Sequence, residues 1–121
     1  MRLIYLIFSF CVIALGLIHV ASTPRFFPHL TSGAVWFASG GLAIMLTGAL
    51  NILRRAYGEL ALGLRWVCVI TNVVMTGFAL LAGYASRASV AQYVVVLGLL
   101  GGTTVFSLMP VAQKSATNQP E

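Results

Sequence analysis

Acidic residues are nearly absent from this sequence. Glu59 and Glu121 are the only two among 121 residues, and charged residues of either sign make up 7% of the chain. A soluble domain carries roughly 25% charged residues, whereas 60% of the residues here are hydrophobic. Water could not cover so much apolar surface. The composition therefore predicts an integral membrane protein, and the length predicts a single domain.

The shortage of carboxylates argues against several kinds of chemistry. Paired carboxylates and the patterns G-x-S-x-G and H-E-x-x-H are missing, so the sequence favours a role other than catalysis. The chain resembles small multidrug transporters in size and helix count. Proton-coupled exporters of that kind depend on a carboxylate inside the membrane, and no apolar run of this chain contains Asp or Glu.

Cysteines and cations are too sparse for two further functions. Cys11 and Cys68 lie inside separate apolar runs and form no C-x-x-C pair. Thiol oxidoreductases need paired cysteines for exchange, so we expect these two to be small apolar fillers. The net charge of +5 comes from seven scattered Arg and Lys residues, a pattern that does not predict nucleic-acid binding.

Four apolar runs separated by short polar turns predict the fold. We expect an all-α integral membrane protein whose four antiparallel transmembrane helices cover about residues 3–21, 33–53, 60–83 and 88–109. Pro24 should end the first helix. Residues 1–110 would then form the four-helix domain, and the polar segment 111–121 a disordered cytoplasmic tail.

The first apolar run could be mistaken for a secretory signal. It extends without a charge over 18 residues, from Leu3 to Val20. The apolar part of a signal peptide reaches about 15 residues, whereas a transmembrane helix needs about 20. We therefore expect this helix to be retained in the mature protein.

The positive charges predict an orientation. With the N-terminus in the cytoplasm, only Arg25 and Arg87 lie outside. The positive-inside rule then predicts an N-in, C-in protein, in a bacterial inner membrane, with the end that carries His19 and His29 facing outward. The cations on the inside would be Arg2, Arg54, Arg55, Arg65 and Lys114.

The stretch from residue 16 to residue 41 concentrates the groups suited to a site. It holds both histidines and two of the four prolines. Outside it, Asn72 lies near the middle of the third span, where an amide should face other helices and be hydrogen-bonded. We expect a ligand-binding site built from His19, Arg25, Phe26, His29, Trp36 and Asn72.

Three functions fit these residues. The first is binding of a lipid-like or small apolar ligand, or of a partner membrane protein, at the outer face. The second is a channel or transporter whose polar path would use Asn51, Asn72, Thr76 and Thr103. The third is a haem- or metal-binding protein that uses His19 as a ligand, with His29 as an optional second one, although metal sites usually need three or four protein ligands.

Partners are expected within the membrane. Twelve glycines favour close contacts between helices, and a bundle of this size has little interior of its own. We therefore expect membrane lipids as partners, together with a homo-oligomer or a larger membrane protein.

Overall fold

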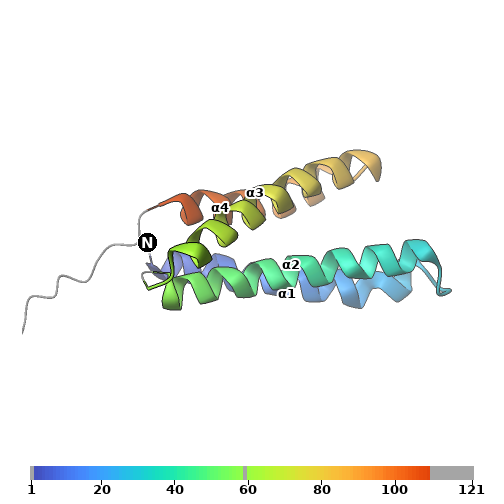
Figure 1. The fold of residues 1–121 in the computed structure, drawn as a ribbon. Helices are drawn as coiled ribbons and strands as arrows, with labels where there is room; N and C mark the ends of the chain where they lie inside the picture. Colours follow the sequence, from blue (N-terminus) through green and yellow to red (C-terminus); the bar gives the residue numbers. More distant parts are fainter. Residues whose placement is uncertain (1, 59, 110–121) are drawn as a thin grey trace, which may run out of the picture.

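The computed structural model describes residues 2–58 and 60–109, which form four helices with short connections (Figure 1). The helices are α1 (Arg2–Phe26), α2 (Ser32–Tyr57), α3 (Leu62–Ala85) and α4 (Val90–Leu108). Each is long and apolar enough to cross a membrane, and no strand occurs in the two described ranges. The predicted all-α class is confirmed, while the predicted tail, residues 111–121, lies outside the described residues.

Helix α1 continues to Phe26, beyond its predicted end at Ala21. Pro24 lies inside the helix, near its end, so the prediction that it would stop the helix was wrong. Pro24 has no backbone N–H to donate to the carbonyl of Val20, four residues earlier, so the helix loses one bond there and continues for only two more residues. The Ser22 hydroxyl also donates to the carbonyl of His19 at 2.9 Å.

Two of the helices begin at side-chain caps. The Thr31 hydroxyl accepts a hydrogen bond from the backbone N–H of Ala34 at 3.2 Å and so starts α2. Ser89 and Gln92 form a capping box at the start of α4, in which each side chain bonds to the other residue's backbone N–H. Such caps satisfy N–H groups that have no partner inside the helix.

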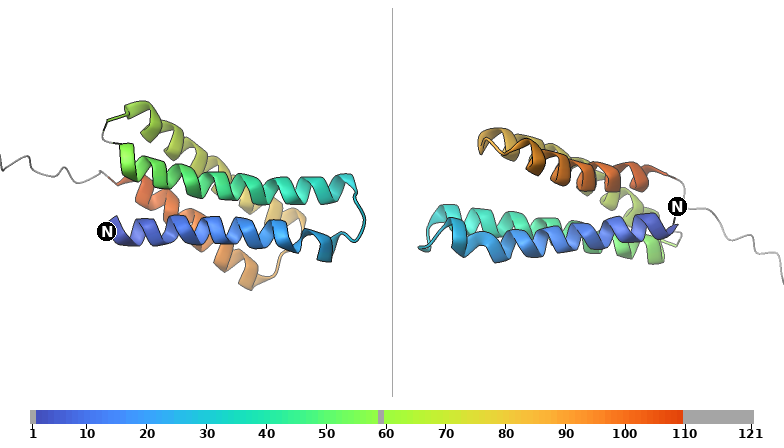
Figure 2. Two further views of the ribbon diagram at one scale, coloured as in Figure 1. Left: turned by 90° about the horizontal axis from the view of Figure 1, so that it is seen from below. Right: turned by 180° about the vertical axis from the view of Figure 1, so that it is seen from behind.

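Helices α1 and α2 pack along most of their length because glycines line the contact (Figures 1 and 2). A methyl group added to Gly48 would lie 2.6 Å from Cγ1 of Ile13. On Gly41 it would lie 2.7 Å from Cγ2 of Val20 and 2.9 Å from the carbonyl oxygen of Gly16. Gly16, Gly41 and Gly48 therefore form a glycine seam that lets the two backbones approach each other closely.

Helices α3 and α4 form a second pair, which is joined mainly through side chains. The hydroxyls of Thr76 and Thr104 lie 3.0 Å apart. The Tyr93 hydroxyl of α4 donates to the carbonyl of Leu80 on α3 at 3.1 Å. A methyl group added to Gly101 of α4 would meet no atom of the described residues within 4 Å. A methyl group added to Gly83 of α3 would instead lie 2.7 Å from Cζ of Tyr93, so this glycine makes room for a side chain and not for a backbone.

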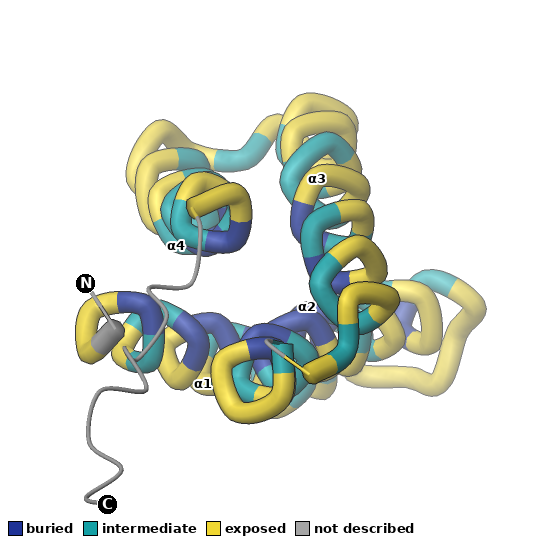
Figure 3. Tube along the Cα trace, turned by 60° about the vertical axis from the view of Figure 1, so that its left-hand side comes forward, coloured by how far each residue is buried: buried dark blue, intermediate teal, exposed yellow. Residues whose placement is uncertain are grey.

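The two pairs lie close together at one end and diverge toward the other (Figures 1 and 2). The close end holds the start of α1, the turn between α2 and α3, and the end of α4. Buried positions of the helices face the space between the pairs (Figure 3). The apolar core is small and consists of Val12, Ile44 and Leu100. Many other large apolar side chains are exposed, an arrangement that suits helices surrounded by lipid.

Replacing Gly41 or Gly48 with alanine should destabilise the bundle. The added methyl overlaps with α1, so we expect the free energy of unfolding to fall by about 1–3 kcal/mol, as in other overpacked interiors. The midpoint of SDS-induced unfolding in mixed micelles measures this loss. Gly101→Ala is the matched control because its methyl enters open space. Equal midpoints for the three variants would contradict the glycine seam.

Candidate functional site

Four aromatic rings gather where α1 ends and α2 begins. The His19 imidazole stacks on the Phe37 ring, with the centroids 3.9 Å apart and the planes 17° from parallel. The rings of Phe26 and Phe27 each lie 5.7 Å from that of Phe37. This aromatic cluster of His19, Phe26, Phe27 and Phe37 thus brings together two of the predicted site residues, His19 and Phe26.

The other residues predicted at this end lie on the surface. Arg25, His29 and Trp36 are exposed, and Trp36 keeps 76% of its surface accessible. In residues 2–58 and 60–109, no group of three or more His, Cys, Asp or Glu side chains could hold a metal. The exposed surface at this end therefore combines the Arg25 cation and the His29 imidazole with the Trp36 ring.

Asn72, the remaining predicted residue, belongs to a buried polar cluster. Its amide pairs with that of Asn51 on α2, and each Nδ2 donates to the other side chain's Oδ1 at 2.8 Å. Neither side chain is more than 1% exposed. The expectation that Asn72 faces another helix and is hydrogen-bonded is confirmed, and α2 is the partner helix.

Tyr5, Cys68 and Arg54 complete the polar cluster. The Tyr5 hydroxyl of α1 donates to Oδ1 of Asn51. The same oxygen accepts a hydrogen bond from the Cys68 thiol of α3 at 3.2 Å. Oδ1 of Asn51 is therefore a common acceptor for α1 and α3, and the cluster joins the first helix pair to the second.

Arg54 is the charged member of the polar cluster and is only 2% exposed. Its Nη1 donates to the Tyr5 hydroxyl at 3.3 Å, and its Nη2 donates to the carbonyl of Met109, just after α4, at 3.4 Å. Its guanidinium carbon lies 5.7 Å from the centroid of the Tyr5 ring. Nε is buried and has no hydrogen-bond partner in the described part of the chain. The described groups that contact this positive charge, the Tyr5 side chain and the Met109 carbonyl, are neutral.

Sequence reasoning missed Tyr5 and Arg54 as members of a site. Arg54 looks like a turn residue because another arginine follows it and α2 is expected to end at Leu53. The helix instead continues to Tyr57, which places Arg54 within its buried face. The 3–4 spacing of Thr47, Asn51 and Arg54, all buried on α2, is the signal that could have revealed this face.

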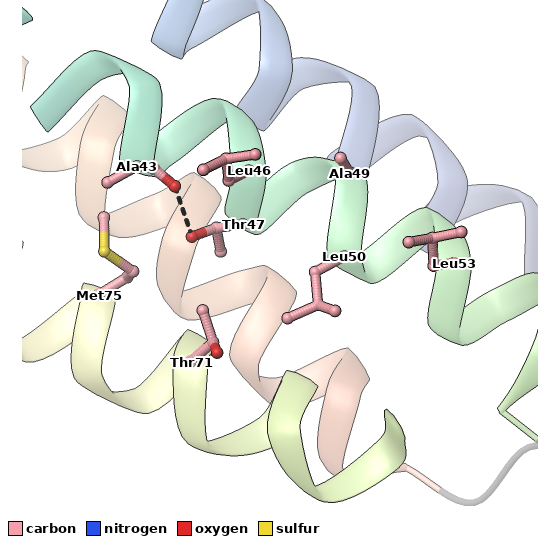
Figure 4. Close-up of a pocket in the computed structure, with 8 residues that line it drawn as sticks. All are labelled: Ala43, Leu46, Thr47, Ala49, Leu50, Leu53, Thr71 and Met75. Atoms are coloured by element: carbon pink, nitrogen blue, oxygen red, sulfur yellow. Dashed lines mark hydrogen bonds between the residues drawn. The ribbon is translucent and has the colours of Figure 1, made fainter. Parts of the chain in front are cut away.

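A groove with a volume of about 480 Å³ runs between α2 and α3 (Figure 4). Two threonines line this groove. The hydroxyl of one of them, Thr47, donates to the carbonyl of Ala43 on the same helix at 2.8 Å. The lining is otherwise almost entirely apolar. It consists of Ala43, Leu46, Thr47, Ala49, Leu50, Leu53, Thr71 and Met75.

No family model, curated protein or solved structure matches this chain. Functional inference for this protein therefore starts from three features of its own: the aromatic cluster, the polar cluster and the α2/α3 groove.

The chemistry open to the polar cluster is limited. Its side chains are two amides, a phenol, a thiol and a guanidinium. Both acidic residues of the sequence, Glu59 and Glu121, lie outside the described residues. The amides of Asn51 and Asn72 are bonded to each other. The cluster thus resembles a polar contact between helices more than a catalytic centre.

The pairing of Asn51 with Asn72 should appear as a measurable coupling. In a double-mutant cycle with Asn51→Ala and Asn72→Ala, we expect an interaction free energy of about 0.6–1.7 kcal/mol, the range found for hydrogen bonds between helices in membranes. SDS-induced unfolding measures it. A control cycle pairs Asn72→Ala with Ser39→Ala, because Ser39 is exposed and bonds only its own helix. That cycle should be additive within about 0.5 kcal/mol, and additivity in both cycles would contradict the pairing.

Proposed function

We propose that this chain is an integral membrane protein that binds a lipid-like apolar molecule between α2 and α3. Its four helices would cross a bacterial inner membrane in antiparallel order, with both termini in the cytoplasm and the aromatic cluster at the outer surface. The distribution of Arg and Lys supports this orientation. The rings of Phe26 and Phe37 then lie at headgroup level, where aromatic side chains are commonly found.

The α2/α3 groove is the observation that carries the proposal. Its volume of about 480 Å³ lies within the range of roughly 300–1,000 Å³ typical of ligand pockets. Small side chains at Ala43 and Ala49 leave the space open, and Leu50 and Met75 supply apolar contact surface. In a membrane, lipid chains are the abundant molecules that match such a lining. The proposed ligand is therefore an acyl or similarly apolar chain.

A channel or transporter is supported less well. Its polar path would need Asn51, Asn72 and Thr76 to face a permeating molecule. In the structure the two amides bond each other, and the Thr76 hydroxyl donates to the carbonyl of Asn72 at 2.8 Å. These groups serve contacts within and between helices, so the apolar groove is the better candidate for binding.

Filling the groove should reduce lipid retention. Ala49→Leu places a larger side chain in the lining, and we expect the apparent affinity for phosphatidylcholine to fall about tenfold, the effect of a moderate steric clash. Native mass spectrometry of the protein in mild detergent with added phosphatidylcholine measures the bound fraction. Ala14→Leu is the matched control, because Ala14 is exposed on α1 and does not line the groove.

Three outcomes are distinguishable. Loss of bound lipid in Ala49→Leu but not in Ala14→Leu supports the proposal. Equal retention in wild type and both variants contradicts it. A second polypeptide that co-purifies in fixed ratio, and is lost only in Ala49→Leu, would show that the groove holds a partner membrane protein instead of a lipid.

A further inference from the structure

Arg54 is a buried cation with no negative group in its described surroundings. Arginine stays protonated in proteins, so burial cannot remove its charge. Enclosing an ionised group is costly unless an opposite charge or good hydrogen bonds compensate. Arg54 is 2% exposed, and residues 2–58 and 60–109 include no Asp or Glu. The described part of the chain therefore supplies no carboxylate for this charge.

The hydrogen bonds of Arg54 are also incomplete. A guanidinium carries five N–H groups. Its two described side-chain bonds, to the Tyr5 hydroxyl and the Met109 carbonyl, are 3.3 and 3.4 Å long. Bonds from a cation to an anion are shorter, about 2.7–2.9 Å. Nε lies buried with no partner in the described ranges. The site thus has spare donors and only weak, neutral acceptors.

Two further features offset only part of the missing negative charge. The guanidinium carbon lies 5.7 Å from the centre of the Tyr5 ring, a cation–π distance. Arg54 also lies in the last turn of α2, where the carbonyl end of a helix carries roughly half a negative charge. Neither feature equals a full counter-charge or gives Nε an acceptor.

We propose that Arg54 binds a phosphate-bearing anion at the close end of the bundle. The planar fork of a guanidinium matches the oxygens of a phosphate group. Nε and an Nη group would bond two of these oxygens, and the anion would replace the weak acceptor at Met109.

The position of Arg54 suggests two sources for the phosphate. Arg54 is three residues from the end of α2 at Tyr57, which the proposed topology places near the cytoplasmic headgroups. The phosphate can therefore belong to an anionic lipid of that leaflet or to a soluble phosphate compound. Arg54 does not line the α2/α3 groove, so this site is separate from the proposed lipid-chain site.

The first test uses the wild-type protein in mild detergent and measures the midpoint of thermal unfolding. Sodium phosphate is compared with sodium chloride at equal ionic strength, and phosphatidylglycerol is compared with phosphatidylcholine. A saturable rise of the midpoint with phosphate, with or without a rise with phosphatidylglycerol, indicates a soluble anion. A rise that keeps growing in proportion to the phosphate concentration is the stabilisation that any excluded salt gives and counts as no specific rise. A rise with phosphatidylglycerol alone indicates a lipid headgroup. No rise specific to either anionic compound overturns the proposal, whatever the variants do.

The second test assigns the effect to Arg54. Arg54→Met removes the charge and keeps much of the length, and the apparent affinity for the active compound should fall roughly tenfold or more, the effect of losing a charged hydrogen bond. Arg54→Lys should retain part of the binding. Arg55→Gln is the control, since it removes the neighbouring exposed cation. The affinity of this variant for the active compound should stay within about threefold of the wild-type value. Equal losses in Arg54→Met and Arg55→Gln would overturn the proposal.

A counter-charge from the chain itself is the main competing explanation. Glu59→Gln and Glu121→Gln test it under the same conditions. If either variant destabilises the protein and wild type shows no anion-specific rise, the charge of Arg54 is matched internally and the proposal is wrong. Should Arg54→Met fail to fold, the wild-type comparison still decides between these two explanations.

Discussion

The reciprocal amide pair of Asn51 and Asn72 is the contact on which the assembly of this bundle depends. It joins α2 to α3 by two hydrogen bonds of 2.8 Å and so links the two helix pairs. In an apolar medium an amide without a partner is unfavourable, so each side chain favours the arrangement that satisfies the other. Tyr5 and Cys68 bond the same acceptor, Oδ1 of Asn51, and Arg54 bonds Tyr5.

The shape of the molecule follows from an unequal distribution of contacts. The glycine seam holds α1 against α2 through backbone contact, and its fit tolerates no added carbon atom. The contacts between the two pairs are fewer, and the hydrogen bonds of the polar cluster that join them lie at the close end. Between bulky side chains such as Leu50 and Met75, the small Ala43 and Ala49 leave the α2/α3 groove. The scarcity of contacts between the two pairs thus lets the pairs diverge and also leaves room for the candidate binding site.

Composition and hydropathy were sufficient to predict four long apolar helices, because few charges interrupt them and short polar turns separate them. The burial of Asn72 was also predictable, since an amide in the middle of an apolar helix needs a partner. The end of α1 was not predictable, because the sequence does not show whether a helix continues past a proline, and this one continues for two residues beyond Pro24, to Phe26.

The polar cluster and the groove required the structure itself. Tyr5, Asn51, Arg54 and Cys68 come from three helices, and their meeting depends on how those helices are rotated and how far they shift along one another. No periodicity in a single segment encodes these quantities. The groove likewise depends on the spacing between α2 and α3. Phe37 contacts both His19 and Phe26, two of the candidate site residues. The sequence did not indicate that Phe37 lies at the centre of this group of rings.

The most direct test of this account is a pair of spin-label distances in lipid nanodiscs. One pair joins Leu3 on α1 to Leu108 on α4 at the close end, and the other joins Leu30 to Ser86 in the connections at the diverging end. All four positions are exposed, and Cys11→Ser removes the exposed native thiol. Two helix pairs that diverge from the close end should give a clearly longer separation between Leu30 and Ser86. Equal separations, or a longer one between Leu3 and Leu108, would contradict two helix pairs that diverge from the close end.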